Sequence, residues 1–124
     1  MCDRYAYSGQ AYTLAKETAI TVEWVCQADA GLPGPDVVFF LHLPPDDAQT
    51  RKQFGGERFE NIAFQKKVSQ NFDGLYNRDQ TSDPNGPKWF KVDARKSVIE
   101  VHEIVKAVAV NVIKAVRYSK LGRV

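Results

Sequence analysis

An apolar run at residues 37–43, Val-Val-Phe-Phe-Leu-His-Leu, constrains the fold more than any other feature of this chain. Its apolar side chains occupy both parities of the run instead of alternating with polar ones. Turn-forming residues bound it on both sides, at 31–35 and at 44–45. Strands with this pattern are buried on both faces, as in a parallel sheet covered by helices. We therefore predict a parallel strand over residues 36–43 and an α/β fold.

The rest of the chain alternates between helical and strand patterns. Apolar spacing predicts further elements, namely helices over residues 8–17, 22–28, 44–52, 61–78 and 97–118 and a strand over 89–92. Ser8 is the predicted N-cap of the first helix. Ser97 and Glu100 have the spacing of a capping box, in which each side chain satisfies the other residue's backbone amide. Alternation of helices and strands favours parallel strand pairing.

Two strands are too few for such a sheet. A two-stranded parallel sheet cannot bury the run at 37–43 on both faces and both edges. The sequence therefore predicts an incomplete fold whose missing strands belong to the N-terminal side.

Composition excludes several classes of partner and site. The chain has 124 residues, a length that fits one domain, and its 17 basic and 15 acidic residues give a net charge of +2. We expect neither a nucleic-acid nor a membrane partner, because the charge is low and dispersed and no run reaches the roughly 18 apolar residues of a membrane span. Cys2 and Cys26 lack the spacing of a zinc site. With no secretory pattern at the start, we expect reduced thiols and a cytoplasmic location, with the nucleus as a further compartment.

A basic, glycine-containing segment at residues 51–60 carries the clearest hint of function. Arg51 and Arg58 flank the pair Gly55-Gly56. Guanidinium groups match phosphate oxygens, and a glycine pair lets the backbone swing. The segment therefore predicts a flap that closes over phosphates, and the alternative is a charged surface loop. No G-x-x-x-x-G-K-[ST] phosphate loop occurs in the chain, which indicates part of an enzyme.

An ordered set of motifs from Asp3 to about Leu121 resembles the C-terminal half of the eukaryotic-type thymidylate kinases. In chain order the motifs are Asp3-Arg4-Tyr5-Ala6-Tyr7-Ser8-Gly9, Ala15-Lys16-Glu17, Gly31-Leu32-Pro33, Pro35 through Leu43, Phe54-Gly55-Gly56-Glu57-Arg58-Phe59-Glu60, Phe64-Gln65, and Val92-Asp93-Ala94-Arg95-Lys96-Ser97. Each motif alone is weak, and the ordered set is specific.

The resemblance implies an incomplete P-loop nucleoside monophosphate kinase fold, in which helices flank a parallel sheet that lacks its N-terminal strands. Residues 1–124 would form one partial kinase domain. Its parts would be an acceptor-site helical region at 3–30, a strand at 36–43, a lid at 51–60, an adenine-loop region at 92–97 and a C-terminal helix at 97–118.

The family transfers the γ-phosphoryl group of ATP to dTMP with Mg²⁺, giving ADP and dTDP for dTTP synthesis, usually as a homodimer. Because the phosphate loop is missing, we expect this chain alone to be inactive. Two alternatives stay open: a non-catalytic nucleotide-binding or dimerising remnant, and another nucleotide kinase of the same superfamily.

The resemblance assigns the acceptor side of the site to the first predicted helix. Arg4 would lie between the acceptor and donor phosphates, and Asp3 would act at most through water on the Mg²⁺ shell, so no residue ligates metal directly. Ser8, Gly9 and Tyr12 would bind dTMP. The alternatives are a solvated terminal pair for Asp3 and Arg4, a helix cap for Ser8, and core packing for Tyr12.

The donor side would come from the lid and from the loop after the second strand. Arg51 would stack on adenine, and Arg58 would reach the phosphates as a catalytic group. Phe59 would face the sugar of dTMP. Some relatives have a tyrosine at this position, and Phe59 lacks the hydroxyl group of that tyrosine. The adenine end would be shaped by three consecutive residues, Asp93, Ala94 and Arg95.

Overall fold

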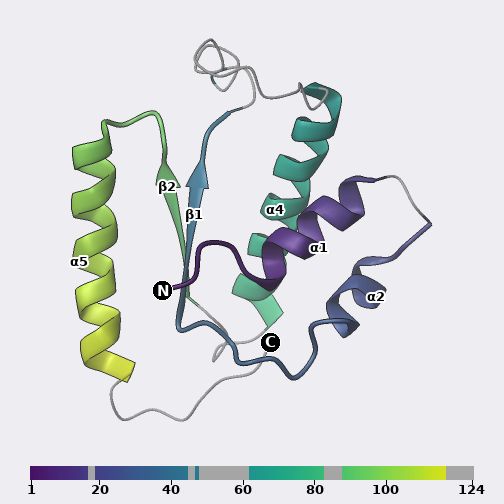
Figure 1. The fold of residues 1–124 in the computed structure, drawn as a ribbon, viewed down its shortest axis with the longest axis horizontal. Helices are drawn as coiled ribbons and strands as arrows, with labels where there is room; N and C mark the ends of the chain where they lie inside the picture. Colours follow the sequence, from purple (N-terminus) through teal and green to yellow (C-terminus); the bar gives the residue numbers. More distant parts are fainter. Residues whose placement is uncertain (17–18, 45–46, 48–61, 83–87, 117–124) are drawn as a thin grey trace.

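The computed structural model describes residues 1–16, 19–44, 47, 62–82 and 88–116. Helices and strands alternate along these residues (Figure 1). The elements are α1 (Ala6–Ala15), α2 (Val22–Gln27), β1 (Val37–His42), α4 (Ile62–Ser82), β2 (Lys88–Asp93) and α5 (Val98–Val116). The predicted helix at 44–52 and the flap at 51–60 lie outside the described residues, apart from Pro44 and Asp47.

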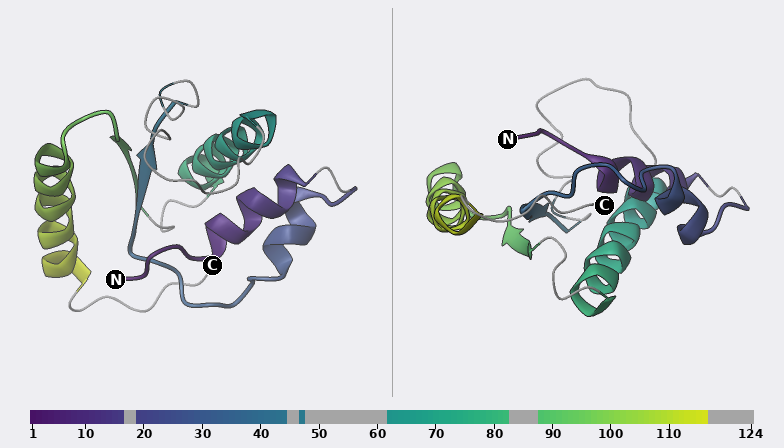
Figure 2. Two further views of the ribbon diagram at one scale, coloured as in Figure 1. Left: turned by 45° about the horizontal axis from the view of Figure 1, so that its top comes forward. Right: turned by 90° about the horizontal axis from the view of Figure 1, so that it is seen from below.

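The described part of the sheet consists of β1 and β2, paired in parallel as predicted. Val38 lies opposite Trp89 and Leu41 opposite Val92 in the register. Helix α5 lies on one face of the sheet, and α1 and α4 lie on the other (Figure 2). The described residues therefore have the helix–sheet–helix layering of an α/β fold, with β1 and β2 in the middle layer.

The core lies between the sheet and the pair α1 and α4. Its buried members are Tyr7, Ala11, Leu75 and Trp89, and partly buried apolar residues pack around them, namely Val38, Phe40, Phe72 and Tyr76. The core residues Phe72, Leu75 and Tyr76 belong to the long helix predicted over residues 61–78, and they form the face by which α4 packs. This core fixes α1 in place, and α1 carries most of the predicted acceptor-site residues.

The predicted capping box at the start of α5 is confirmed, whereas the predicted N-cap of α1 is wrong. The Ser97 N–H donates to Glu100 Oε2 at 2.9 Å and the Glu100 N–H donates to Ser97 Oγ at 3.3 Å, which is a capping box. Ser8, in contrast, is not an N-cap. Helix α1 begins at Ala6 after an extended Tyr5 that makes no side-chain cap, and the Ser8 N–H donates to the Tyr5 carbonyl at 3.0 Å. The helix starts earlier because burial of Tyr7 favours a helical first turn there.

Candidate nucleotide site

Arg4 stands out at the N-terminal end of α1. Its φ of 66° places a residue with a Cβ in the left-handed region, which costs free energy and often marks a functional position. The Arg4 side chain is exposed, and its guanidinium carbon lies 5.5 Å from the centroid of the Tyr12 ring. A cation held over an aromatic face in this way is attracted by the ring quadrupole.

Tyr12 connects this arginine to the body of the protein. The Tyr12 ring is half-buried, and its centroid lies 6.1 Å from that of Phe64 at the start of α4. The Tyr12 ring therefore packs against α4, as the core-packing alternative expects, and it also lies against the Arg4 guanidinium.

Ser8 and Gly9 lie on α1 between Arg4 and Tyr12. Ser8 is half-buried and Gly9 is exposed. A Cβ added to Gly9 would meet no described atom within 4 Å. The space over Gly9 is thus open among the described residues, so a ligand could approach the helix backbone closely there.

Asp93, Ala94 and Arg95 form a second group where β2 ends. The Ala94 N–H donates to the His42 carbonyl at 2.9 Å, which ties this loop to the end of β1. Ligands of open α/β sheets bind outside the carboxyl ends of the strands, which is where this loop lies.

Within that loop, Arg95 forms an ion pair and several hydrogen bonds with Asp93. The Arg95 Nε and Nη2 atoms donate to the two carboxylate oxygens at 2.9 and 2.8 Å, and the Arg95 backbone N–H donates to Oδ1 at 2.9 Å. These hydrogen bonds hold the pKa of Asp93 well below its ordinary value. The Arg95 side chain remains 61% exposed despite these hydrogen bonds.

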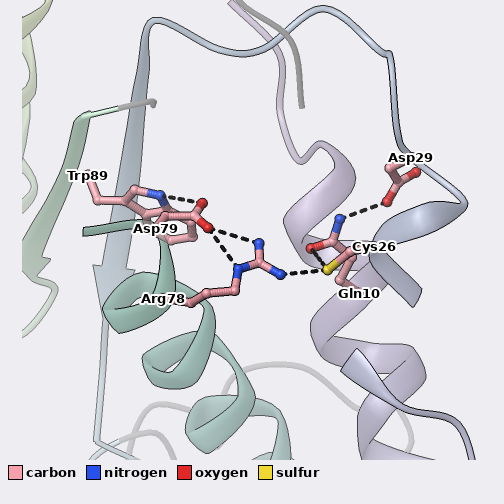
Figure 3. Close-up of polar contacts among 6 residues, drawn as sticks. All are labelled: Gln10, Cys26, Asp29, Arg78, Asp79 and Trp89. Atoms are coloured by element: carbon pink, nitrogen blue, oxygen red, sulfur yellow. Dashed lines mark hydrogen bonds and ion pairs between the residues drawn. The ribbon is translucent and has the colours of Figure 1, made fainter. Parts of the chain in front are cut away.

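A polar network that joins α1, α2, α4 and β2 was not predicted from the sequence (Figure 3). The Asp79 carboxylate accepts from Arg78 at 3.0 and 2.8 Å and from Trp89 Nε1 at 3.2 Å. Arg78 Nη1 also lies 2.6 Å from Cys26 Sγ. Through these contacts α4 is joined to β2 on one side and to α2 on the other.

Gln10 extends the network into α1. It is 1% exposed, and its Nε2 donates to Asp29 Oδ2 at 2.9 Å while the Cys26 thiol donates to its Oε1 at 3.7 Å. A buried amide needs such partners, since an unsatisfied one would be costly. A polar residue beside the apolar Ala11 was the one sequence feature that could have indicated a buried contact here. The network positions α1 and therefore positions Ser8, Gly9 and Tyr12.

Tyr7, also on α1, is buried in the core next to Asp79 of this network. It is 6% exposed, and its ring centroid lies 4.7 Å from that of Trp89 in an edge-on arrangement. Burial first, and then the neighbouring Asp79 carboxylate, raise the pKa of the Tyr7 hydroxyl well above its ordinary value.

The predicted site residues thus form two groups among the described residues, and a third set lies outside the described residues. Arg4 and Tyr12 are brought together, with Ser8 and Gly9 on the same helix, and the second group is Asp93, Ala94 and Arg95. Among the described residues, no contact joins the two groups. Arg51, Arg58 and Phe59 lie outside the described residues.

Neither a metal cluster nor a membrane helix is found in the described part of the chain. Across those residues, no three His, Cys, Asp or Glu side chains gather where they could hold a metal ion. Asp3 is a single exposed carboxylate, which suits contact through water. None of the described helices is both long and apolar enough to span a bilayer.

Comparison with known proteins agrees with these observations. The family model for thymidylate kinase matches residues 1–105. The chain is 40% identical over 120 residues to the thymidylate kinase of Danio rerio and 42% identical over 120 residues to that of Homo sapiens. In both cases the match covers 97% of this chain and 53% of the relative.

A solved structure gives the same result for the fold. The thymidylate kinase of Candida albicans superposes with a TM-score of 0.72 at 31% sequence identity, covering 98% of this chain and 59% of that one. The chain therefore spans about half the length of the relatives it matches, and its described strands and helices correspond to part of the kinase fold of those relatives. Taken together, the ordered motifs, the family match and the shared fold show that this chain belongs to the thymidylate kinase family.

Proposed function

We propose that this chain is the acceptor-side and adenine-side portion of an enzyme that transfers the γ-phosphoryl group of ATP to dTMP. The observation that carries the proposal is the Arg4 guanidinium, held 5.5 Å from the Tyr12 ring in a segment that the family model matches. An exposed arginine supported by packed rings is suited to hold a phosphate in a fixed place.

An enzyme that catalyses phosphoryl transfer acts mainly by positioning positive charge, and its side chains take little part in covalent chemistry. Negative charge spreads over the oxygens of the transferred group in the transition state, and preorganised cations stabilise it. Arg4 would supply such a charge between the acceptor and donor phosphates. Mg²⁺ would enter with the nucleotide phosphates and neutralise charge there, and the Asp3 carboxylate would contact its water shell.

The acceptor nucleotide would lie along α1. Ser8 can donate a hydrogen bond, Gly9 leaves room against the helix, and the Tyr12 ring can form one wall of a base pocket. The open space at Gly9 supports this arrangement.

ATP would lie at the other group. The exposed Arg95 side chain would contact the adenine, and Asp93 would hold the Arg95 guanidinium in place through their paired hydrogen bonds. From the resemblance we further propose that Arg51 stacks on the same base, that Arg58 reaches the phosphates, and that Phe59 faces the deoxyribose.

The complete activity would need the part of the fold that this chain does not span. A nucleotide-binding portion without turnover is the second candidate, and the lack of a G-x-x-x-x-G-K-[ST] motif in the chain favours it for the isolated polypeptide. Another nucleotide specificity within the superfamily is the third.

Substrate profiling separates these candidates. The chain would be fused to the portion of the human relative that it does not match, and ADP release would be followed with dTMP, dCMP, AMP or UMP as acceptor. We expect dTMP to give the highest kcat/KM. A preference for another monophosphate would overturn the assignment of substrate, and binding of dTMP without turnover by the fusion would favour the non-catalytic reading.

A further inference from the structure

We propose that Phe64 is a positioning residue of the acceptor site, which acts through the Tyr12 ring to hold the Arg4 guanidinium in place. The inference rests on the proposed function, in which Arg4 holds the phosphates. Phe64 belongs to the motif Phe64-Gln65, to which the resemblance assigned no role. None of the described site residues assigned above belongs to α4, so the proposal adds a second helix to the acceptor side.

The first argument is that the Arg4 side chain has little support of its own. It is exposed, and within the described residues it forms no hydrogen bond or ion pair. Its partner there is the Tyr12 ring, whose centroid lies 5.5 Å from the guanidinium carbon. An arginine side chain has many rotamers in solvent. The guanidinium therefore stays in one place only as far as the Tyr12 ring does.

The second argument is that Phe64 holds the Tyr12 ring. Both side chains are half-buried, and their ring centroids lie 6.1 Å apart with an angle of 58° between the planes. Aromatic rings attract each other in such tilted arrangements. Among the described residues, Phe64 is the one aromatic ring that lies against Tyr12. Loss of the Phe64 ring would leave a gap beside Tyr12, so the Tyr12 ring would be free to turn and the Arg4 guanidinium would lose its support.

The third argument is that α4 fixes this part of α1 through its backbone as well. Phe64, Val68 and Asn71 follow helical spacing, so they lie on one face of α4. Val68 is 4% exposed, and Asn71 Nδ2 donates to the Ala11 carbonyl at 3.0 Å, so this face packs on α1 (Figure 1). Because Ala11 precedes Tyr12, one face of α4 holds both the backbone and the ring beneath Arg4. A precisely placed cation requires such support.

Phe72 provides a matched control on the same helix. It is also a half-buried phenylalanine, but its ring stacks on Phe40 of β1, with 5.2 Å between the centroids. Phe72→Leu removes a ring from the interface between α4 and the sheet and leaves the contact of Phe64 with Tyr12 intact. Phe64→Tyr is the conservative variant, because it keeps the ring at position 64.

Nuclear magnetic resonance of the 124-residue chain tests the contact without nucleotide or turnover. The Tyr12 ring shifts the side-chain resonances of Arg4 upfield, and Tyr12→Leu gives their position without the ring. We expect Phe64→Leu to move these resonances most of the way to that position, and Phe64→Tyr and Phe72→Leu to leave them near the wild-type values. Phe64→Met gives the same test if the leucine variant does not fold. Arg4 resonances that Phe64→Leu or Phe64→Met leaves unmoved would overturn the proposal.

A double-mutant cycle in the fusion to the unmatched portion of the human relative tests the effect on catalysis. We expect Phe64→Leu to lower kcat with dTMP about tenfold when Arg4 is present and by less than about twofold in the Arg4→Ala background. Phe72→Leu should act alike in both backgrounds. Equal effects of Phe64→Leu in the two backgrounds would overturn the proposal, because a residue that only stabilises the fold behaves in that way. A fusion that does not turn over dTMP would contradict the proposed function instead, and the Arg4 resonances of the 124-residue chain would then decide the role of Phe64.

Discussion

At the scale of single residues, the backbone of Arg4 and the environment of Tyr7 depart most from the ordinary. Arg4 holds a left-handed φ of 66° next to the helix that carries the predicted acceptor site. Tyr7 is buried in the core beside a carboxylate that belongs to the Arg78–Asp79 pair. The first departure lies beside the residues that we assign to the acceptor site, and the second concerns how α1 is held in the core.

Tyr7 gives a pH-dependent stability that can be measured. Its raised pKa in the folded state means that its contribution is fully present below the unfolded pKa of about 10 and is lost as pH rises above that value. We expect the free energy of unfolding to fall by up to about 1.4 kcal/mol for each pH unit in that range from this residue alone.

Urea unfolding of the wild type and of Tyr7→Phe between pH 8 and 11 checks this prediction. The other tyrosines are common to both proteins, so the difference between the two curves isolates Tyr7. The advantage of the wild type should shrink above about pH 10. Two curves that stay parallel across the range would contradict it.

At the scale of helices and strands, regular patterns were predictable and long-range contacts were not. The strand predicted over residues 36–43, the long helix predicted over 61–78 and the capping box at Ser97 each depend on residues close in sequence, and all three are confirmed. The start of α1 was misplaced because burial of Tyr7 outweighed the capping preference of Ser8. The network of Gln10, Cys26 and Arg78 joins residues as many as 52 positions apart, which no local pattern reveals.

The capping box of α5 supports a prediction at this scale. Ser97→Ala removes the side-chain acceptor of the Glu100 amide, so we expect a loss of about 1 kcal/mol in the free energy of unfolding. Ser97→Thr is the matched control because it keeps the hydroxyl. Urea unfolding at neutral pH measures both. An alanine variant as stable as the threonine variant would show that the cap contributes nothing.

At the scale of the whole molecule, the layers and the comparisons describe one portion of a kinase fold. The sequence predicted a sheet with few strands, and the residues that the structure describes form two, in a chain that matches 53% of the length of the human and zebrafish relatives. The resemblance already divided the candidate site into an acceptor side and a donor side. The contacts of Tyr12 with Arg4 and with Phe64 could be found only with coordinates, because no local pattern in the sequence specifies how α1 packs on α4. The assignments of Arg51, Arg58 and Phe59 still depend on the resemblance alone.

The most direct test of the account is the rate of dTDP formation from ATP and dTMP by three proteins: the chain alone, its fusion to the unmatched portion of the human relative, and that fusion with Arg4→Ala. We predict turnover by the fusion, essentially none by the chain alone, and a fall in kcat of about a hundredfold or more for Arg4→Ala with a smaller change in KM. An Arg4→Ala fusion that retains the parent's kcat, or a chain that turns over alone as fast as the fusion, would contradict the account.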